Sequence, residues 1–368
     1  MHDLHDILEG FKDPAAAKIL ANNLRNLEGE PVSIMEVCGT HTMSIFKYGI
    51  RSLLPKSIRL VSGPGCPVCV TPVAYMDAAI QLSRRADVIL ATFGDLMKVP
   101  GSSSSLTVEK QHGADIRVVY SPLDALGIAS ENKEKKIVFL SVGFETTAPV
   151  CALTVLRARE EGLLNYYLLS ANKTMPKALE LIAGDREADI GGFLYPGNVS
   201  AITGTGLFDE IAEKFGVPGV VTGFEPLDIL HGIITLTGLI RSGESRIENE
   251  YKRVVRPEGN PIALSKLNEV FEPCDAIWRG LGTIPLSGLT IRGEYSGFDA
   301  WKVFEIAVQT GKEPAGCLCP QVLTGRVTPD KCMHFGKKCT PDSPVGACMV
   351  SSEGTCAAYY RFGSQISG

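Results

Sequence analysis

The sequence has no run of about 18 uninterrupted apolar residues, so no segment has the length of a membrane-spanning helix. Its first stretch, MHDLHDILEGFKDP, carries three aspartates and one glutamate and lacks the apolar core of a signal peptide. No run of like charge is long enough for an interaction tail, and the formal net charge is -5. These absences argue against a membrane, secreted or nucleic-acid-binding protein and predict a cytoplasmic one.

Cysteine, by contrast, is abundant, with eleven residues in a chain of 368. Six of them fall within residues 317–356, and Cys151 and Cys274 stand alone as expected small core residues. The other three lie in two glycine-bearing turns, at Cys38, Cys66 and Cys69. Because disulfides are rare in the cytosol, such clustering indicates metal or redox chemistry.

Short apolar runs alternate with helical patterns up to about residue 242, which is typical of parallel α/β structure. The alternation occurs twice, at offsets of about 102 to 108 residues. The paired segments are 33–42 with 138–147, 59–65 with 167–173, 84–94 with 186–196, and 118–126 with 220–230. We therefore predict two similar parallel-sheet α/β domains of four strands each, at 1–128 and 129–242. The alternative is one large α/β sheet with chance similarity.

From about residue 243 the pattern changes, which predicts a third, cysteine-rich domain at 243–368. Its tail carries prolines and glycines but little apolar material, so covalent or metal bonds must organise it. The spacing C-x14-C-x6-C-x16-C is given by Cys317, Cys332, Cys339 and Cys356. Four thiolates suit a [4Fe–4S] cluster or a zinc ion. A set with Cys319 in place of Cys317 stays open, and His334 is a minor ligand candidate.

Cys38 follows the first predicted strand, and Cys66 and Cys69 follow the second. Ligands and reactive groups collect at the carboxyl ends of parallel strands, so neighbouring strands would place all three thiols along one sheet edge. Each turn leads into a predicted helix, whose N-terminus favours a thiolate. The C-x-x-C turn therefore suits a redox-active or soft-metal pair, with a half zinc site or a buried pair as the alternative.

Two further residues are candidates for the same chemistry. His41 lies one turn from the Cys38 thiol and is either a ligand or a hydrogen-bonding residue. Glu145 belongs to GFETT, at a strand end in the second copy. This glutamate either faces a cleft shared by the two copies or lies solvated beside an N-capping threonine.

Together, CGTHT, GPGCPVC, GFETT and the tail spacing resemble the HypD family of hydrogenase maturation factors. Each motif alone is a weak signal, whereas the combination is specific, and the resemblance covers essentially the whole chain. It implies two related α/β domains and a third domain that holds a [4Fe–4S] cluster. It also implies a scaffold that works with the small partner HypC to assemble the Fe(CN)2CO unit of [NiFe] hydrogenases. HypE, loaded by HypF, would donate the cyanide.

The same resemblance implies a role for each motif cysteine. Cys38 would ligate the nascent iron together with the partner, and Cys66 and Cys69 would be the redox-active pair. A thiol relay between cluster and cleft would be formed by Cys319 and Cys348. The cluster itself would be held by Cys317, Cys332, Cys339 and Cys356.

The residues leave competing functions open. The residues favour a redox-active assembly scaffold over a turnover enzyme, leave catalytic or stoichiometric use open, and favour a monomer outside its heterocomplexes. A disulfide reductase of the ferredoxin:thioredoxin reductase sort would use the same cysteines but give Cys38 no distinct role. A zinc-stabilised α/β binding protein without redox work is the third possibility.

Overall fold

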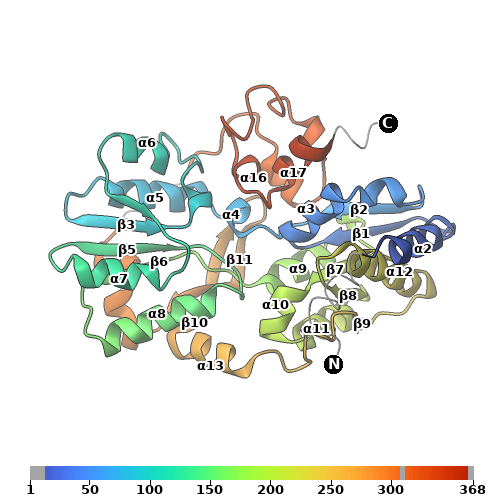
Figure 1. Cartoon of the computed structure of the whole chain (residues 1–368), viewed down its shortest axis with the longest axis horizontal. Helices are drawn as coiled ribbons and strands as arrows, with labels where there is room; N and C mark the ends of the chain where they lie inside the picture. Colours follow the sequence, from blue (N-terminus) through green and yellow to red (C-terminus); the bar gives the residue numbers. More distant parts are fainter. Residues whose placement is uncertain (1–12, 307–310, 364–368) are drawn as a thin grey trace.

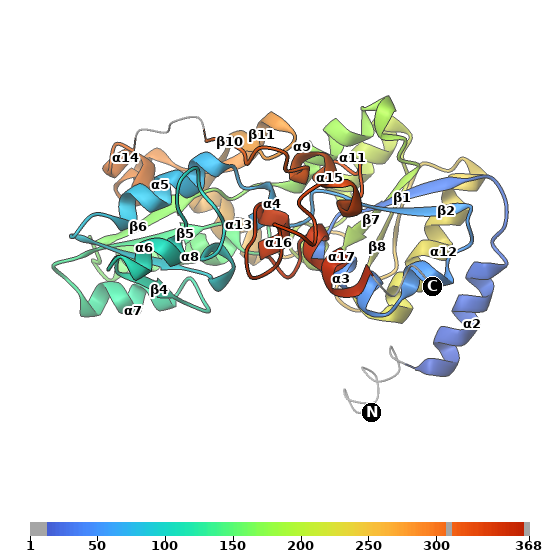
Figure 2. The same ribbon diagram turned by 90° about the horizontal axis from the view of Figure 1, so that it is seen from above.

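The computed structural model describes residues 13–306 and 311–363, so nearly all of the N-terminal stretch MHDLHDILEGFKDP lies outside it. Two parallel β-sheets with flanking helices form two lobes, and the cysteine-rich tail lies between them (Figures 1 and 2). None of the helices in the described ranges is long and apolar enough to cross a membrane. The predicted α/β class with parallel sheets is confirmed.

The first sheet has five parallel strands in the order β2-β1-β7-β8-β9. Every residue of β1 and β7 is buried, as in parallel sheets covered on both faces. Helices α2, α3 and α12 pack on one face, and α9 and α11 pack on the other. The strands are β1 (Val32–Glu36), β2 (Ile58–Ser62), β7 (Gly192–Pro196), β8 (Gly219–Thr222) and β9 (Ile247–Asn249).

The second sheet has four parallel strands in the order β4-β3-β5-β6. Helices α7 and α8 cover one face of it, and α5 packs against the other. The largest apolar cluster runs from this second face through the tail to the first sheet, so the lobes share one core. The strands are β3 (Val88–Thr92), β4 (Ile116–Val118), β5 (Lys136–Ser141) and β6 (Tyr166–Ser170).

The sheets do not divide the chain at residue 128 as predicted. The first sheet takes β1 and β2 from residues 1–128 and β7 and β8 from 129–242, and the second sheet takes β3, β4, β5 and β6. The prediction of two contiguous four-stranded domains is therefore wrong in its assignment of strands. Strands predicted to correspond still occupy equivalent places, since β2-β1-β7-β8 matches β6-β5-β3-β4. The pairing of β1 with β7 in the middle of the first sheet joins segments far apart in the sequence, which no local pattern specifies.

Residues 243–368 are also not a separate layer, contrary to the predicted third domain. Strand β9 extends the first sheet, while α13 (Pro261–Val270) packs on α8 in the other lobe. An antiparallel hairpin of β10 (Phe271–Trp278) and β11 (Gly282–Ile291) covers the end of β6. In the described ranges the cysteine-rich tail adds no strand to either sheet, and it lies between the lobes as the red segment in Figure 1.

The helices begin where the local chemistry allows. The Asp13 side chain accepts a 2.8 Å hydrogen bond from the Ala15 backbone and so caps α2, with Pro14 in the first turn. The other helices are α3 (Gly39–Lys47), α4 (Pro67–Val70), α5 (Val73–Ser83), α6 (Leu106–Gln111), α7 (Asp124–Glu131), α8 (Ala148–Glu160), α9 (Met175–Ala183), α10 (Gly197–Thr203), α11 (Gly206–Phe215), α12 (Pro226–Ser242), α14 (Ala300–Val303), α15 (Cys319–Leu323), α16 (Ala347–Val350) and α17 (Thr355–Phe362). Helix α2 itself spans Pro14–Arg25.

Candidate thiol and metal site

The two cysteine turns of the first sheet lie against each other. Strands β1 and β2 are parallel neighbours, so the turns that follow them leave the same sheet edge, as expected from the sequence. Gly39 donates a backbone hydrogen bond of 3.2 Å to Gly65. A Cβ atom at Gly65 would lie 2.3 Å from the backbone nitrogen of Cys38. Only glycine allows this approach, which places the Cys38 turn on the C-x-x-C turn.

Cys66 and Cys69 are joined by a disulfide bond and are both buried. The Cys66 sulfur also accepts a 3.2 Å hydrogen bond from the Cys69 backbone, at the start of the single turn α4. Thr71 ends this turn, and its hydroxyl donates a 2.8 Å hydrogen bond to the carbonyl oxygen of Pro67. Helix α5 begins only at Val73. The pair therefore lies inside the apolar core rather than on the surface of the turn.

Cys38 immediately precedes α3, and only 7% of its surface is exposed. Burial and the nearby negative charge of Glu353 raise the pKa of the Cys38 thiol to about 11. Glu353 belongs to the tail, and its carboxylate accepts a 2.7 Å hydrogen bond from the hydroxyl of Thr40. In the protein alone, Cys38 is a neutral thiol at neutral pH.

Glu36 is a buried carboxyl group that the sequence interpretation missed. It ends β1, two residues before Cys38, and one carboxylate oxygen accepts hydrogen bonds from Ser62 at 2.6 Å and Thr42 at 3.2 Å. Burial raises the pKa of Glu36 to about 7, although Arg51 lies 3.9 Å away and opposes the shift. An acidic residue inside the apolar run SIMEV was the signal for it.

His41 is a hydrogen-bonding core residue in this structure. Its Nε2 lies 2.9 Å from the Gly223 carbonyl oxygen, and its ring packs against Phe224 at a centroid distance of 4.8 Å. Complete burial lowers the pKa of His41 to about 4, so the ring is neutral and Nε2–H donates. Within residues 13–306 and 311–363, Nδ1 has no hydrogen-bond partner. The bond fixes α3 to the turn after β8.

Glu145 lies in the other lobe, at the turn after β5. It is 4% exposed, so of the two alternatives the solvated side chain is wrong. One carboxylate oxygen accepts a 2.8 Å hydrogen bond from the Met175 backbone at the start of α9. Burial raises the pKa of Glu145 to about 7. The structure does not bring Glu145 to the thiols by any described hydrogen bond, and a catalytic role for it remains a prediction.

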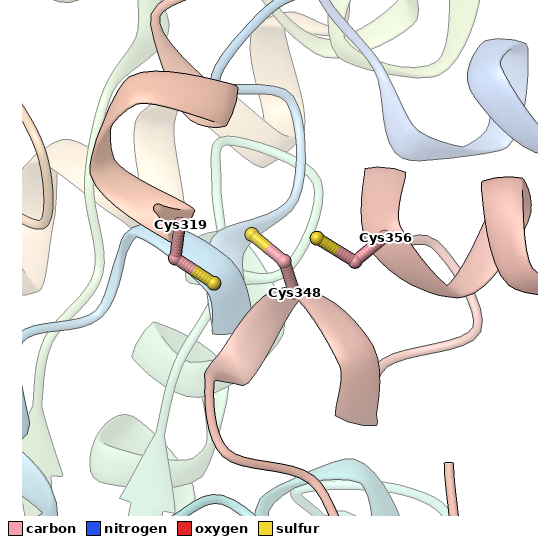
Figure 3. Close-up of side chains that lie close together, drawn as sticks. All are labelled: Cys319, Cys348 and Cys356. Atoms are coloured by element: carbon pink, nitrogen blue, oxygen red, sulfur yellow. The ribbon is translucent and has the colours of Figure 1, made fainter. Parts of the chain in front are cut away.

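Three tail cysteines converge from three short helices (Figure 3). The sulfur atoms of Cys319 on α15, Cys348 on α16 and Cys356 on α17 all lie within 4.8 Å of one another, and all three residues are buried. Hydrogen bonds from the Cys319 and Cys348 thiols lower the pKa of Cys356, whereas the pKa of Cys348 is raised. A buried cluster of soft donors, one already favoured as a thiolate, can hold a metal or an iron–sulfur cluster.

The remaining tail cysteines lie around this triad at different depths. The pKa of Cys317 is raised by its hydrogen bond with Cys319, and Cys339 accepts a 3.3 Å hydrogen bond from Val345. A Cβ atom at Gly346 would lie 2.6 Å from the Cys319 sulfur and 2.8 Å from the Cys317 sulfur. The predicted ligand Cys332 is not in the triad, and its sulfur lies 3.8 Å from the Gly316 carbonyl. The triad thus combines one predicted ligand with both predicted relay thiols.

Comparison with known proteins decides the family. A family model named HypD and described as the "Hydrogenase formation hypA family" matches residues 15–363. The chain belongs to the HypD family. It is 45% identical to the hydrogenase maturation factor HypD of Rhodobacter capsulatus, over 96% of this chain and 97% of that protein. It is 43% identical to the Escherichia coli (strain K12) factor, over 94% and 93% of the two chains. It is 42% identical to the hydrogenase expression/formation protein HupD of Azotobacter chroococcum, over 97% of both.

In this HypD-family chain the tail contacts both lobes. These contacts place the tail cysteines beside the cysteine turns of the first sheet. Helix α16 packs on α4, and Glu353 holds the Cys38 turn. Ser351 donates a 3.0 Å hydrogen bond to Asp95, which follows β3 in the other lobe. Arg279 is 3% exposed, donates from its side chain to Thr71 at 3.1 Å, and brings positive charge to Cys317. The C-x-x-C turn therefore contacts both the Cys38 turn and the short tail helices that carry Cys319 and Cys348.

Proposed function

We propose that this protein is the scaffold on which the Fe(CN)2CO unit of [NiFe] hydrogenases is assembled. HypC shares the iron with it, and HypE, loaded by HypF, supplies the cyanide. The observation that carries the proposal is the packing of the Cys38 turn directly on the Cys66–Cys69 turn, beside the tail thiols, in a member of the HypD family. The protein acts in the cytoplasm and is a monomer outside these heterocomplexes.

Cys38 is suited to holding the iron of this cargo. Low-valent iron that carries cyanide and carbonyl prefers a soft thiolate. Because the pKa of Cys38 is raised to about 11, the thiol stays protonated and unreactive until a cation displaces its proton. Because only 7% of the surface of Cys38 is exposed, a partner that shares the iron must bind where this residue meets the surface.

Cys66 and Cys69 are suited to supply the electrons. Release of cyanide from a thiocyanate-like donor breaks an S–C bond. Each cyanide released consumes one pair of electrons. A reduced Cys66/Cys69 dithiol provides two electrons and two protons as it forms the disulfide that the structure contains. Contact between α4 and α16 leaves Cys348 on the neighbouring helix as the next thiol for exchange.

The tail provides the donors for the resident cofactor. In the proposal Cys317, Cys332, Cys339 and Cys356 hold a [4Fe–4S] cluster, and Cys319 and Cys348 relay electrons; the set with Cys319 in place of Cys317 remains the alternative. When bound, such a cluster supplies electrons singly. Burial of the triad, the space kept by Gly346 and the lowered pKa of Cys356 support a thiolate-ligated group here.

The test is an infrared spectrum of the protein co-produced with HypC and purified without air. Cyanide and carbonyl stretches fall where protein absorbs little. The scaffold predicts such bands, and their loss in Cys38→Ala. Cys151→Ala, at an isolated buried cysteine, is the matched control and should retain them. Bands that persist in Cys38→Ala would show that Cys38 is not the iron ligand.

A cluster-dependent disulfide reductase is the second candidate, favoured by the disulfide that lies beside the tail thiols. Under that function, Cys38→Ala leaves disulfide reduction intact, and the anaerobic protein is brown without cyanide or carbonyl bands. A colourless preparation with stoichiometric zinc would instead support a zinc-stabilised binding protein.

A further inference from the structure

A cavity of about 270 Å³ lies in the second lobe, at the carboxyl end of β6. The start of α5 and the β10–β11 hairpin close it. It is lined by Tyr75, Asn172, Lys173, Cys274 and Trp301, among others, and by none of the cysteines assigned to the thiol and metal site. The ends of parallel strands are where α/β sheets place ligands.

Lys173 is a buried cation at this strand end. It is 3% exposed, and burial lowers its pKa to about 8, which keeps it charged at neutral pH. Its ammonium group lies 5.8 Å from the centre of the Trp278 ring. In the part of the chain that the structure describes, it makes no side-chain hydrogen bond or ion pair, and the charge of Cys274 opposes the lowering of its pKa. A buried charge without a partner is costly unless a ligand supplies one.

Asn172 adds an unused donor beside this cation. It is 1% exposed, and its carbonyl oxygen accepts hydrogen bonds from the hydroxyls of Ser141 and Ser170. Its amide nitrogen has no partner among the described residues. Buried polar groups are nearly always paired, so the free amide and the free ammonium on adjacent residues both call for an acceptor.

The rest of the lining fixes the kind of acceptor. The Asp275 carboxylate accepts a 3.1 Å hydrogen bond from the Leu286 backbone. The Asp299 carboxylate accepts a 3.1 Å hydrogen bond from the Trp301 backbone and forms an ion pair with Lys302 at 3.7 Å. Both carboxylates thus already have partners, and neither is paired with Lys173. The other walls are mainly apolar, with Ile277, Leu289 and the rings of Tyr75 and Trp301. A ligand must therefore combine a negative acceptor with a small apolar body.

We propose that this cavity binds a small organic carboxylate. Its oxygen atoms accept hydrogen bonds from the Lys173 ammonium and the Asn172 amide, and its apolar part packs on Tyr75 and Trp301. The site is separate from the iron and redox thiols, and it does not depend on the function proposed above.

Intrinsic fluorescence tests the proposal directly, because the sequence has two tryptophans: Trp301 lines the cavity, and the ring of Trp278 lies beside the Lys173 ammonium. Sodium butyrate is titrated at constant ionic strength into the full chain. The expected result is a saturable change in tryptophan emission and a rise in melting temperature. Butyramide, which has the same shape without the charge, is expected to give neither. A butyramide response equal to that of butyrate, or an equal response to chloride or inorganic phosphate, would overturn the carboxylate assignment.

Lys173→Met removes the cation and keeps an apolar chain of similar length. It is expected to weaken butyrate binding by about tenfold or more, because a charge-assisted hydrogen bond is lost. Lys177→Met, at a more exposed lysine of α9 paired with Glu180, is the matched control and should bind as the unmodified protein does. Equal butyrate affinity in Lys173→Met, or no saturable response in the unmodified protein, would refute the site. Folding of each variant is checked by its melting transition.

Discussion

The two lobes carry different chemistry at equivalent strand ends. In the first lobe, Gly65 packs on the backbone of Cys38. In the second, Lys173 holds the equivalent place of Gly65 and donates a 3.0 Å backbone hydrogen bond to Gly143, the equivalent of Cys38. Glu353 of the tail covers the Cys38 turn of the first lobe. Strand β11 covers the Lys173 turn of the second lobe, where the Thr174 backbone donates a 2.9 Å hydrogen bond to Ser287.

This comparison separates placement from chemistry. Parallel strands deliver the turns to the same edge whatever their residues are. In the first lobe the turn after β1 carries Cys38 and the turn after β2 carries Gly65. The result is a buried thiol, which is a soft metal ligand. In the second lobe the order is reversed, which gives a buried cation beside an apolar cavity. One framework therefore supports a thiol site and an anion site.

The largest expected effect comes from adding a side chain at Gly65, where the two turns of the first lobe pack on each other. Gly65→Ala places a methyl group 2.3 Å from the Cys38 nitrogen and should lower the free energy of unfolding by about 3 kcal/mol. Gly127→Ala, in α7 with open space around it, should instead raise it by about 1 kcal/mol. Denaturant unfolding of both variants measures the difference. Equal effects would show that the two turns are not tightly packed.

Next in size is the buried carboxyl of the second lobe. Because the pKa of Glu145 rises from 4.5 to about 7 on folding, its burial destabilises the protein increasingly from pH 4.5 to 7 and constantly above that range. Glu145→Gln should therefore raise the free energy of unfolding by about 2 kcal/mol at pH 8 and change it little at pH 4.

The corresponding change in the first lobe, Glu36→Gln, should help less, because Arg51 partly compensates that charge. Glu134→Gln, on the exposed surface, is the control and should show no such pH dependence. Chemical denaturation across this pH range provides the measurement. A Glu145→Gln gain that is equal at pH 4 and pH 8 would contradict the burial of a protonated carboxyl.

Reducing the Cys66–Cys69 disulfide is expected to cost about 2 kcal/mol, since the closed loop is very short. The melting temperature with and without a reductant, under argon, measures this effect. The double variant Cys66→Ala, Cys69→Ala should show a much smaller response to reductant. An undiminished response in that variant would place the sensitive bond elsewhere.

The smallest effect concerns the cover over Cys38. Glu353→Gln removes a negative charge that raises the pKa of Cys38, so alkylation of this thiol at pH 8 should be about threefold faster. Peptide mass spectrometry of the reduced protein follows the labelling. The exposed Glu258→Gln is the control, and slower labelling in Glu353→Gln would show that Glu353 acts by shielding rather than by charge.

Much of the local structure could be predicted from the sequence. The buried strands and the turns after them were evident in runs such as SIMEVCGTHT, because apolar periodicity and glycine act over a few residues. Placing Cys38 beside Cys66 required only that β1 and β2 be neighbours. The pairing of β1 with β7 could not be predicted, since it joins segments about 160 residues apart. The same holds for the Thr40–Glu353 bond.

The sequence by itself determined the α/β class, the cysteine-bearing turns and the resemblance to the HypD family, since these depend on residue type and short spacing. Only the tertiary structure decided which strands share a sheet, that Glu36 and Glu145 are buried, and that Cys319, Cys348 and Cys356 converge. It also decided that Lys173 is buried in the lining of a cavity, with no side-chain hydrogen bond or ion pair to any residue that the structure describes. The physical reason is that burial and charge pairing are properties of the packed chain, set by contacts between residues distant in sequence.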